Sequence, residues 1–420
     1  MNSVYRIPLP IFFTVLLACI AVACTANGPS TVPNPGQSSV LSAEDERERN
    51  PKHFTAIDSD TMEPGQICVV NRDPAAADRF EEAVRKMGYT RQKRRHLKGL
   101  GFVMSIFGAP QGYTVRQGIL ELRDKFPGVV IDANHRYRIL ASRTTDPHRY
   151  GQSMVGWTTA SADCRQAARI GLVDTHIDRS HPALVKQDIV TRSFLPDTVP
   201  TAPESHGTAI ATLLVGRSSQ DNCGLLPRSQ LVVAEIFRHR DARHVDTTTW
   251  SIARALDWLV GEGVQVINLS FGGPRNALLS LAVSRTLNQG IVLVAAAGYL
   301  EGGGGEPEYP AAQQGVLAVT ALDAAMQPYR HVRTGRYIAY SAPGVDIWVP
   351  GKGGGKFVSG TSFAAPFVTA AIASLQLTHP AWETHQVLQV LEKSARDLGE
   401  PGRDPIFGWG LVQAPFDCPQ

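Results

Sequence analysis

Apolar and polar positions follow two different patterns along the chain, and the change between them divides it into two units. Between residues 63 and 142 the spacing predicts four short strands and two amphipathic helices in the order β-α-β-β-α-β. The strands are expected at 67–70, 89–95, 101–107 and 129–132, and the helices at 75–87 and 115–126. This order indicates the ferredoxin-like arrangement, in which both helices cover one face of an antiparallel sheet.

From residue 168 onward, short β-branched runs alternate with helical segments. Strands are expected at 170–173, 231–237, 264–269, 291–296 and 316–319, and helices at 249–260, 277–288 and 367–377. This alternation predicts an α/β fold, a parallel sheet with helices on both faces, behind the small α+β unit. In such sheets functional groups collect at the carboxyl ends of the strands.

The N-terminal sequence indicates export. Arg6 precedes an apolar run, residues 11–23, which is shorter than the roughly 18 residues of a membrane-spanning helix and ends in small residues. Cys24 follows directly, and the tripeptide before it resembles the lipobox of bacterial lipoproteins. We expect lipidation of Cys24 and attachment to the bacterial cell envelope, with plain secretion as the alternative.

The expected organisation has four parts. Residues 1–23 form a signal peptide, and the polar, Pro- and Ser-containing residues 24–62 form a flexible linker. Residues 63–142 form the ferredoxin-like unit, and residues 143–420 form the α/β unit.

Composition narrows the class of protein further. The 420 residues are 43% hydrophobic and 19% charged, which suits a folded chain and excludes a disordered, collagen-like or coiled-coil one. A net charge of +3 gives no support for a nucleic-acid partner. Six cysteines are too few for a disulfide scaffold, but in an oxidising compartment four of them could pair in any of three connectivities. These four are Cys68, Cys164, Cys223 and Cys418.

Three polar residues lie at the ends of predicted strands or the starts of predicted helices, where parallel sheets place their functional groups. Asp174 ends the strand at 170–173, His206 opens a helix of small and apolar residues, and Ser362 follows a tight glycine-containing turn before an apolar helix. Each alone is more often a turn, core or capping residue. Together they supply a nucleophile, a base that takes its proton and an acid that orients the base.

The order Asp174, His206, Ser362 is that of subtilisin, and the string Gly360-Thr361-Ser362-Phe363-Ala364-Ala365-Pro366 resembles the subtilisin-like serine peptidases, or subtilases. The resemblance covers about residues 150–412. It implies a serine endopeptidase that cuts proteins or peptides with this triad. It also implies that the ferredoxin-like unit is a propeptide, which assists folding, inhibits the enzyme through its tail and is removed by self-processing.

The resemblance also implies the roles of nearby residues. Ser270, Phe271 and Gly272 would align the substrate opposite Ala297 and Gly298. The Ser362 amide and the Thr361 hydroxyl would stabilise the oxyanion.

One departure concerns the oxyanion. Tyr299 replaces the asparagine that normally donates to it, a loss worth about 10²–10³ in turnover, unless the phenol folds back to donate. The replacement keeps open a second hypothesis, that of a weak or inactive subtilase acting as a surface binding or assembly protein. The intact triad favours the enzyme.

Glu308 precedes Tyr309-Pro310, where the family places the base of the pocket for the side chain before the scissile bond. A carboxylate there would attract lysine or arginine, unless the neighbouring glycine run leaves Glu308 in solvent. A basic preference would suit self-cleavage after Arg143 or Arg149.

Two further expectations come from the resemblance. His176 stands where the family usually has glycine, and a minor effect is expected because histidine tolerates left-handed backbone. No cofactor is expected. Calcium is plausible for a subtilase, but no acidic loop has recognisable ligand spacing, so no metal ligands are assigned.

Overall fold

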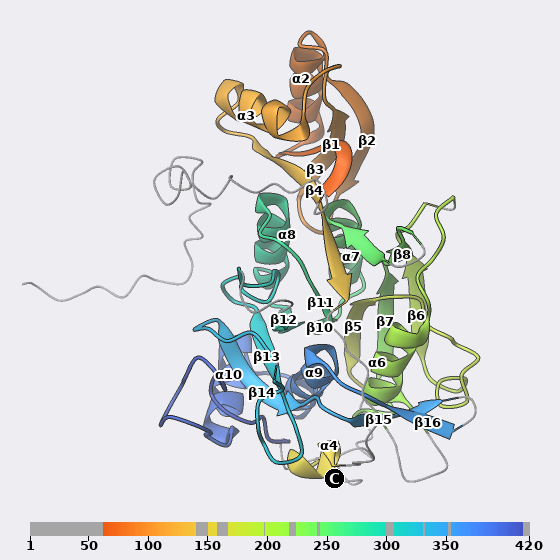
Figure 1. Ribbon diagram of the computed structural model, residues 1–420, viewed down its shortest axis with the longest axis vertical. Helices are drawn as coiled ribbons and strands as arrows, with labels where there is room; N and C mark the ends of the chain where they lie inside the picture. Colours follow the sequence, from red (N-terminus) through yellow and green to blue (C-terminus); the bar gives the residue numbers. More distant parts are fainter. Residues whose placement is uncertain are drawn as a thin grey trace, which may run out of the picture.

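The computed structural model describes residues 62–139, 150–157, 167–196, 198–217, 224–241, 244–299, 306–330, 332–351 and 354–414. A small N-terminal unit lies at one end of a larger α/β unit (Figure 1). The predicted signal peptide, Cys24, most of the linker, Arg143 and Arg149 lie outside the described residues.

The N-terminal unit has the predicted β-α-β-β-α-β order. It comprises β1 (Met62–Asn71), α2 (Pro74–Arg85), β2 (Thr90–Leu97), β3 (Phe102–Gly108), α3 (Val115–Lys125) and β4 (Val130–Ile139). The strands lie antiparallel in the order β2-β3-β1-β4, and the helices share one buried core with the sheet, as the ferredoxin-like prediction requires. The main difference is β4, which continues to Ile139 instead of ending at Asp132.

The face of this sheet away from its helices packs on the larger unit. Cys68 lies there as a buried thiol with no disulfide to another described residue, and burial raises its pKa. The other three cysteines considered for pairing lie outside the described residues.

The larger unit is built on a seven-stranded parallel sheet in the order β14-β13-β12-β10-β5-β7-β6. The strands are β5 (Arg169–Asp174), β6 (Ile189–Ser193), β7 (Gln230–Glu235), β10 (Val266–Leu269), β12 (Val292–Ala296), β13 (Leu317–Leu322) and β14 (Ile338–Pro343). Sequence analysis missed the two edge strands. β6 ends in exposed polar residues, and β14 ends in a Ser-Ala-Pro string that is typical of a turn.

Helices cover both faces of this sheet. On one face lie α6 (Ser205–Val215) and α9 (Thr361–Thr378), with α10 (Thr384–Ser394) against α9. On the other lie α7 (Thr249–Gly261) and α8 (Ala277–Leu287). Of the helices described, α9 alone is long and apolar enough to cross a membrane, and its burial in the core accounts for its composition. The remaining elements are α4 (Gly151–Met154), β8 (Arg238–His239), β9 (Val245–Thr248), β11 (Phe271–Gly272), β15 (Ile347–Gly351) and β16 (Gly354–Val358).

The N-terminal unit is held on α7 and α8 by two side chains of β4. The Trp250 amide donates to Asn134 Oδ1 at 3.0 Å, and the Ala277 amide donates to Asp132 Oδ2 at 2.8 Å. Both amides belong to first helical turns, which lack acceptors of their own, so the unit caps two helices at once.

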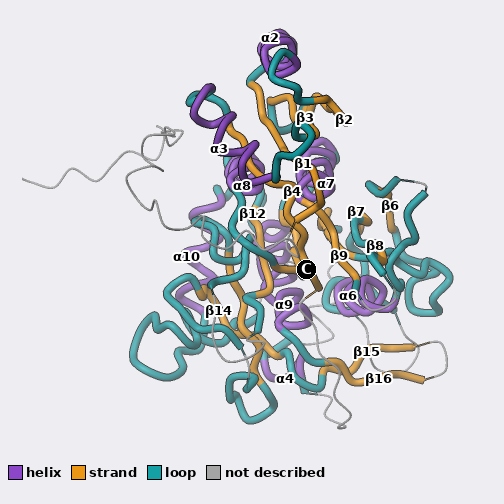
Figure 2. Tube along the Cα trace, turned by 45° about the horizontal axis from the view of Figure 1, so that its top comes forward, coloured by secondary structure: helices purple, strands orange, loops and turns teal. Residues whose placement is uncertain are grey.

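Beyond these caps β4 runs on into the larger unit (Figures 1 and 2). Its last residues pair antiparallel with β9 on one side and with β11 on the other. The end of the N-terminal unit is therefore a strand whose two neighbours, β9 and β11, both belong to the larger unit.

Candidate active site

Asp174 and His206 form a buried pair at the carboxyl end of the parallel sheet. Asp174 ends β5, and its Oδ1 lies 2.7 Å from His206 Nδ1 and accepts from the Thr175 amide at 2.7 Å. The two side chains are 2% and 10% exposed. Low exposure strengthens the contact, since little water competes for it.

The start of α6 is fixed against the end of β5. The Gly207 amide donates to Thr175 Oγ1 at 2.8 Å, and a Cβ on Gly207 would lie 2.7 Å from the Thr175 carbonyl oxygen. Only glycine permits this approach. The His206 Nε2 atom, on the far side of the ring from Asp174, has no hydrogen-bond partner among the described residues.

Ser362 lies at the start of α9, immediately after a backbone conformation that only glycine adopts readily. Gly360 has φ 148° and ψ 158°, and the helix begins at Thr361. The prediction that the helix begins at Phe367 is wrong because Pro366 lies inside it. Pro366 has no N–H for the Ser362 carbonyl, and the Ser270 hydroxyl donates to that carbonyl instead, at 3.3 Å.

The histidine lies against the turn that carries the serine. The ring centroids of His206 and Phe363 are 5.5 Å apart, and Phe363 directly follows Ser362. The Ser362 hydroxyl itself donates to the Ser270 carbonyl at 3.0 Å. The three residues singled out from the sequence therefore meet at one place, with the serine hydroxyl turned toward Ser270.

Sequence analysis did not identify the residues that support Ser270. Asn268 Nδ2 donates to Ser270 Oγ at 2.7 Å, and Thr369 Oγ1 lies 3.0 Å from Asn268 Oδ1. Both side chains are fully buried. A lone asparagine in an otherwise apolar buried strand is the signal that could have revealed this network.

The expected oxyanion and substrate residues lie beside Ser362. The Gly298 amide donates to Thr361 Oγ1 at 3.1 Å, which joins the loop after β12 to the start of α9. Tyr299 follows, and its backbone pairs with Val332. Ser362 is in the first turn of α9, where amides find no acceptor within the helix. The roles of these groups stay predictions.

The expected substrate-aligning segment already pairs with a strand. In β11, Phe271 lies opposite Ile139 and Gly272 lies opposite Arg138, while Arg138 also lies opposite Asp246 of β9. The end of β4 thus lies between two strands, in the position that an extended peptide would take by strand addition.

The environment of Glu308 separates the two expectations for it. Glu308 is buried, so the alternative that it lies in solvent is wrong, and its place in the substrate pocket stays a prediction. Its Oε1 accepts from Arg333 Nη2 at 3.3 Å. The carboxylate that was expected to attract a basic substrate side chain therefore has a cation of its own.

His176 forms a second acid–histidine pair near Asp174. Its Nδ1 lies 2.7 Å from Glu235 Oε2, and Glu235 ends β7 opposite Asp174. Burial raises the pKa of Glu235, and the neighbouring His176 opposes the rise. His176 does not adopt left-handed backbone, because only Met326 and Asp346 have positive φ among the described non-glycine residues, so its tolerance of that geometry is not called on.

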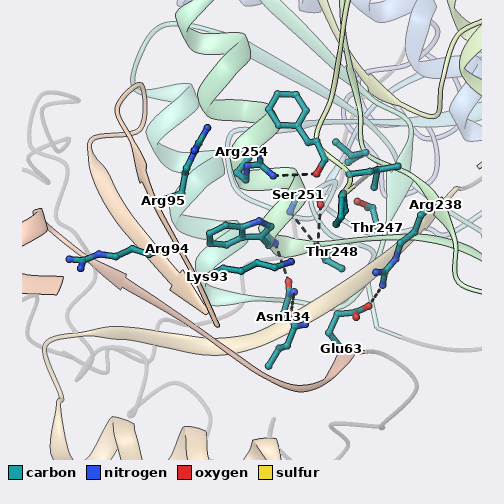
Figure 3. Close-up of a pocket in the computed structure, with 16 residues that line it drawn as sticks. Glu63, Lys93, Arg94, Arg95, Asn134, Arg238, Thr247, Thr248, Ser251 and Arg254 are labelled. Carbon is teal, nitrogen blue, oxygen red and sulfur yellow. Dashed lines mark hydrogen bonds and ion pairs between the residues drawn. The ribbon is translucent and has the colours of Figure 1, made fainter. Parts of the chain in front are cut away.

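A cavity of about 420 Å³ lies where the two units meet (Figure 3). It is lined by Lys93 and Arg95 of β2 and by Arg254 of α7, while Arg238 is paired with Glu63 at one end. Burial and the nearby arginines lower the pKa of Arg254. None of the three residues of the candidate triad lines the cavity, so it is not where the reaction would occur. Over the described ranges, no three His, Cys, Asp or Glu side chains gather to hold a metal ion.

Comparisons with known proteins match the α/β unit. The family model described as "Subtilase family" matches residues 165–410. Subtilisin from Bacillus pumilus is 34% identical over 253 residues, covering 58% of this chain and 88% of that relative. Subtilisin E from Bacillus subtilis is 33% identical, and the match covers 58% of this chain and 64% of that relative, just under two thirds of its length.

A solved structure extends the likeness to the fold of both units. Fervidolysin from Fervidobacterium pennivorans, described as a keratinolytic enzyme related to subtilisin, superposes with a TM-score of 0.70. The match covers 85% of this chain and 61% of that one at 22% identity, so it shows the fold alone.

Proposed function

Because the chain belongs to the subtilase family of serine peptidases, we propose that it hydrolyses peptide bonds through Asp174, His206 and Ser362. The observation that carries the proposal is the buried 2.7 Å contact of Asp174 with His206, beside the turn of Ser362. A carboxylate on Nδ1 keeps that nitrogen protonated and leaves Nε2 free to act as the base.

The reaction begins when the Ser362 hydroxyl turns from the Ser270 carbonyl to His206 Nε2. Nε2 takes the proton as Oγ attacks the substrate carbonyl, and Asp174 stabilises the imidazolium. The Ser362 amide and the Thr361 hydroxyl donate to the oxyanion. His206 then gives the proton to the leaving amine, and water hydrolyses the acyl-enzyme by the same two steps.

The substrate backbone would enter as a strand between β9 and β11, where the end of β4 lies. Peptide and propeptide therefore compete for one position, and the N-terminal unit acts as an intramolecular inhibitor until it is cut and released. The same strand register predicts the position of the cut, because it shows which residue of the propeptide lies beside Ser362.

We expect the mature N-terminus to be Ala141. Ile139 lies opposite Phe271, and the next position in the register is opposite Ser270, whose carbonyl contacts the Ser362 hydroxyl. A cut at that position follows Leu140, which is outside the described residues. N-terminal sequencing of the processed protein checks this, and Arg143→Gln and Arg149→Gln should mature like wild type. A mature chain beginning at Thr144 or Tyr150 would contradict it.

Export and anchoring rest on the N-terminal sequence. We expect Cys24→Ser to move the protein from the membrane fraction to the medium or periplasm, because a lipidated cysteine with a flexible linker would tether the enzyme. Fractionation followed by an immunoblot measures this, with Cys19→Ser as the matched control. Wild-type retention by the Cys24 variant would contradict lipidation at Cys24 and indicate another anchor.

A further inference from the structure

A buried ion pair, Glu308–Arg333, joins a segment bonded to the end of β11, one neighbour of the inserted strand, to a segment bonded to the loop after β12. Arg333 Nη2 lies 3.3 Å from Glu308 Oε1, and the side chains are 11% and 4% exposed. Two charges taken this far out of water depend on each other, because neither could be left alone without a large cost.

Glu308 belongs to the β11 side of the site. The next residue, Tyr309, exchanges two backbone hydrogen bonds with Gly273, at 2.9 and 3.0 Å. Gly273 directly follows Gly272, which pairs with Arg138 of the inserted strand. The carboxylate is therefore anchored one residue from the segment that holds the substrate backbone.

Arg333 contacts the loop after β12, which approaches Ser362 from another direction. Its amide donates to the Gly298 carbonyl at 3.2 Å, and Val332 pairs with Tyr299. Gly298 in turn bonds Thr361, the neighbour of Ser362. The ion pair thus connects the β11 side of the site to the loop that contacts the neighbour of Ser362.

We propose that Arg333 determines specificity by supplying the cation for Glu308, so that the pocket for the side chain before the scissile bond rejects lysine and arginine. The inference rests on the proposed peptidase function. A substrate cation would meet a carboxylate already paired and a second positive charge beside it, and in a buried site that repulsion is weakly screened.

Both charges also affect the neighbouring Tyr337 phenol. Burial raises the pKa of the Tyr337 phenol to about 12, with Glu308 raising it and Arg333 lowering it. The negative charge of Glu308 and the positive charge of Arg333 cancel, and the phenol is neutral, so the site has no net charge for a charged substrate to neutralise. It suits an uncharged side chain, and Leu140 at the expected self-cleavage position is one.

Removing Arg333 should reverse this selection. Arg333→Met keeps an unbranched apolar stem but removes the Arg333 cation from the buried Glu308, and an arginine from the substrate can then take its place. The reciprocal change, Glu308→Gln, leaves Arg333 without an anion and should favour a substrate glutamate. The two variants of this ion pair should therefore shift the substrate preference in opposite directions, one toward arginine and the other toward glutamate.

The test uses processed enzyme and peptides that differ only before the scissile bond, with leucine, glutamine, glutamate, lysine or arginine there. We expect wild type to prefer leucine over arginine. The ratio of kcat/KM for arginine over leucine should rise about 10- to 100-fold in Arg333→Met, and the glutamate ratio should rise in Glu308→Gln. The double variant should lose both gains, and Arg336→Met, an exposed arginine nearby, should match wild type.

Each outcome has a distinct meaning. A wild type that cuts best after lysine or arginine overturns the inference at once, and so do variants that cut with an unchanged preference. If Arg333→Met does not fold, Glu308→Gln and the wild-type profile still decide the question. Failure of wild type to cut any peptide would instead count against the proposed peptidase function.

Discussion

Replacing Ser362 with alanine should lower turnover on a peptide substrate by about 10⁶-fold and leave the chain uncut between its two units. The size is the one known for the nucleophile of a subtilisin triad, where loss of the serine removes as much as loss of all three residues. The variant also loses the hydrogen bond to Ser270, a modest change in stability of about 1 kcal/mol. The fold should therefore survive.

Peptide turnover and the mass of the purified chain measure both effects. Ser374→Ala is the matched control, since Ser374 is another buried serine of α9 and is remote from the candidate triad in sequence. It should mature and turn over like wild type. Turnover within tenfold of wild type in the Ser362 variant, or normal maturation, would show that another group performs the attack.

Replacing Tyr299 with asparagine should raise kcat by about 10²–10³-fold with little change in KM. The substitution restores a side-chain amide beside Gly298 and Thr361, aimed at charge that exists only in the transition state. Steady-state kinetics that separate kcat from KM test this. Tyr299→Phe is the control, and it should equal wild type if the phenol does not donate.

Other outcomes for Tyr299 are informative. A lower rate in both variants would show that the phenol already serves the oxyanion. A lower rate in Tyr299→Asn alone would indicate a packing role for the ring, because asparagine would leave a cavity. A wild type without turnover whose activity Tyr299→Asn restores would support the binding-protein hypothesis for the natural chain.

Local pattern was sufficient for most strands and helices. It also singled out three residues that the structure brings to one place, Asp174, His206 and Ser362, because each lies at the end of an element that its own sequence specifies. It failed for β4. Residues 133–139 carry Asn134, His135, Arg136 and Arg138, which do not resemble a buried strand. Their place in a strand depends on partners in β9 and β11, more than a hundred positions away, and local sequence contains no sign of them.

The predictions of where α9 starts and of what surrounds Glu308 failed for the same reason. Proline normally lies at or before the first helical turn, and here the Ser270 hydroxyl satisfies the carbonyl that Pro366 leaves without a donor. Glu308 and Arg333 are 25 positions apart on loops with no shared pattern. Contacts of this kind between distant loops leave no mark in local sequence, whereas motifs do.

The most direct test of the triad is labelling with a serine-directed fluorophosphonate after the N-terminal unit has been removed. The reagent reacts only with an activated hydroxyl and depends less on a complete oxyanion site. The account predicts one labelled peptide, containing Ser362, in wild type and no label in His206→Ala. Unlabelled wild-type enzyme, or label that persists in His206→Ala, would contradict it.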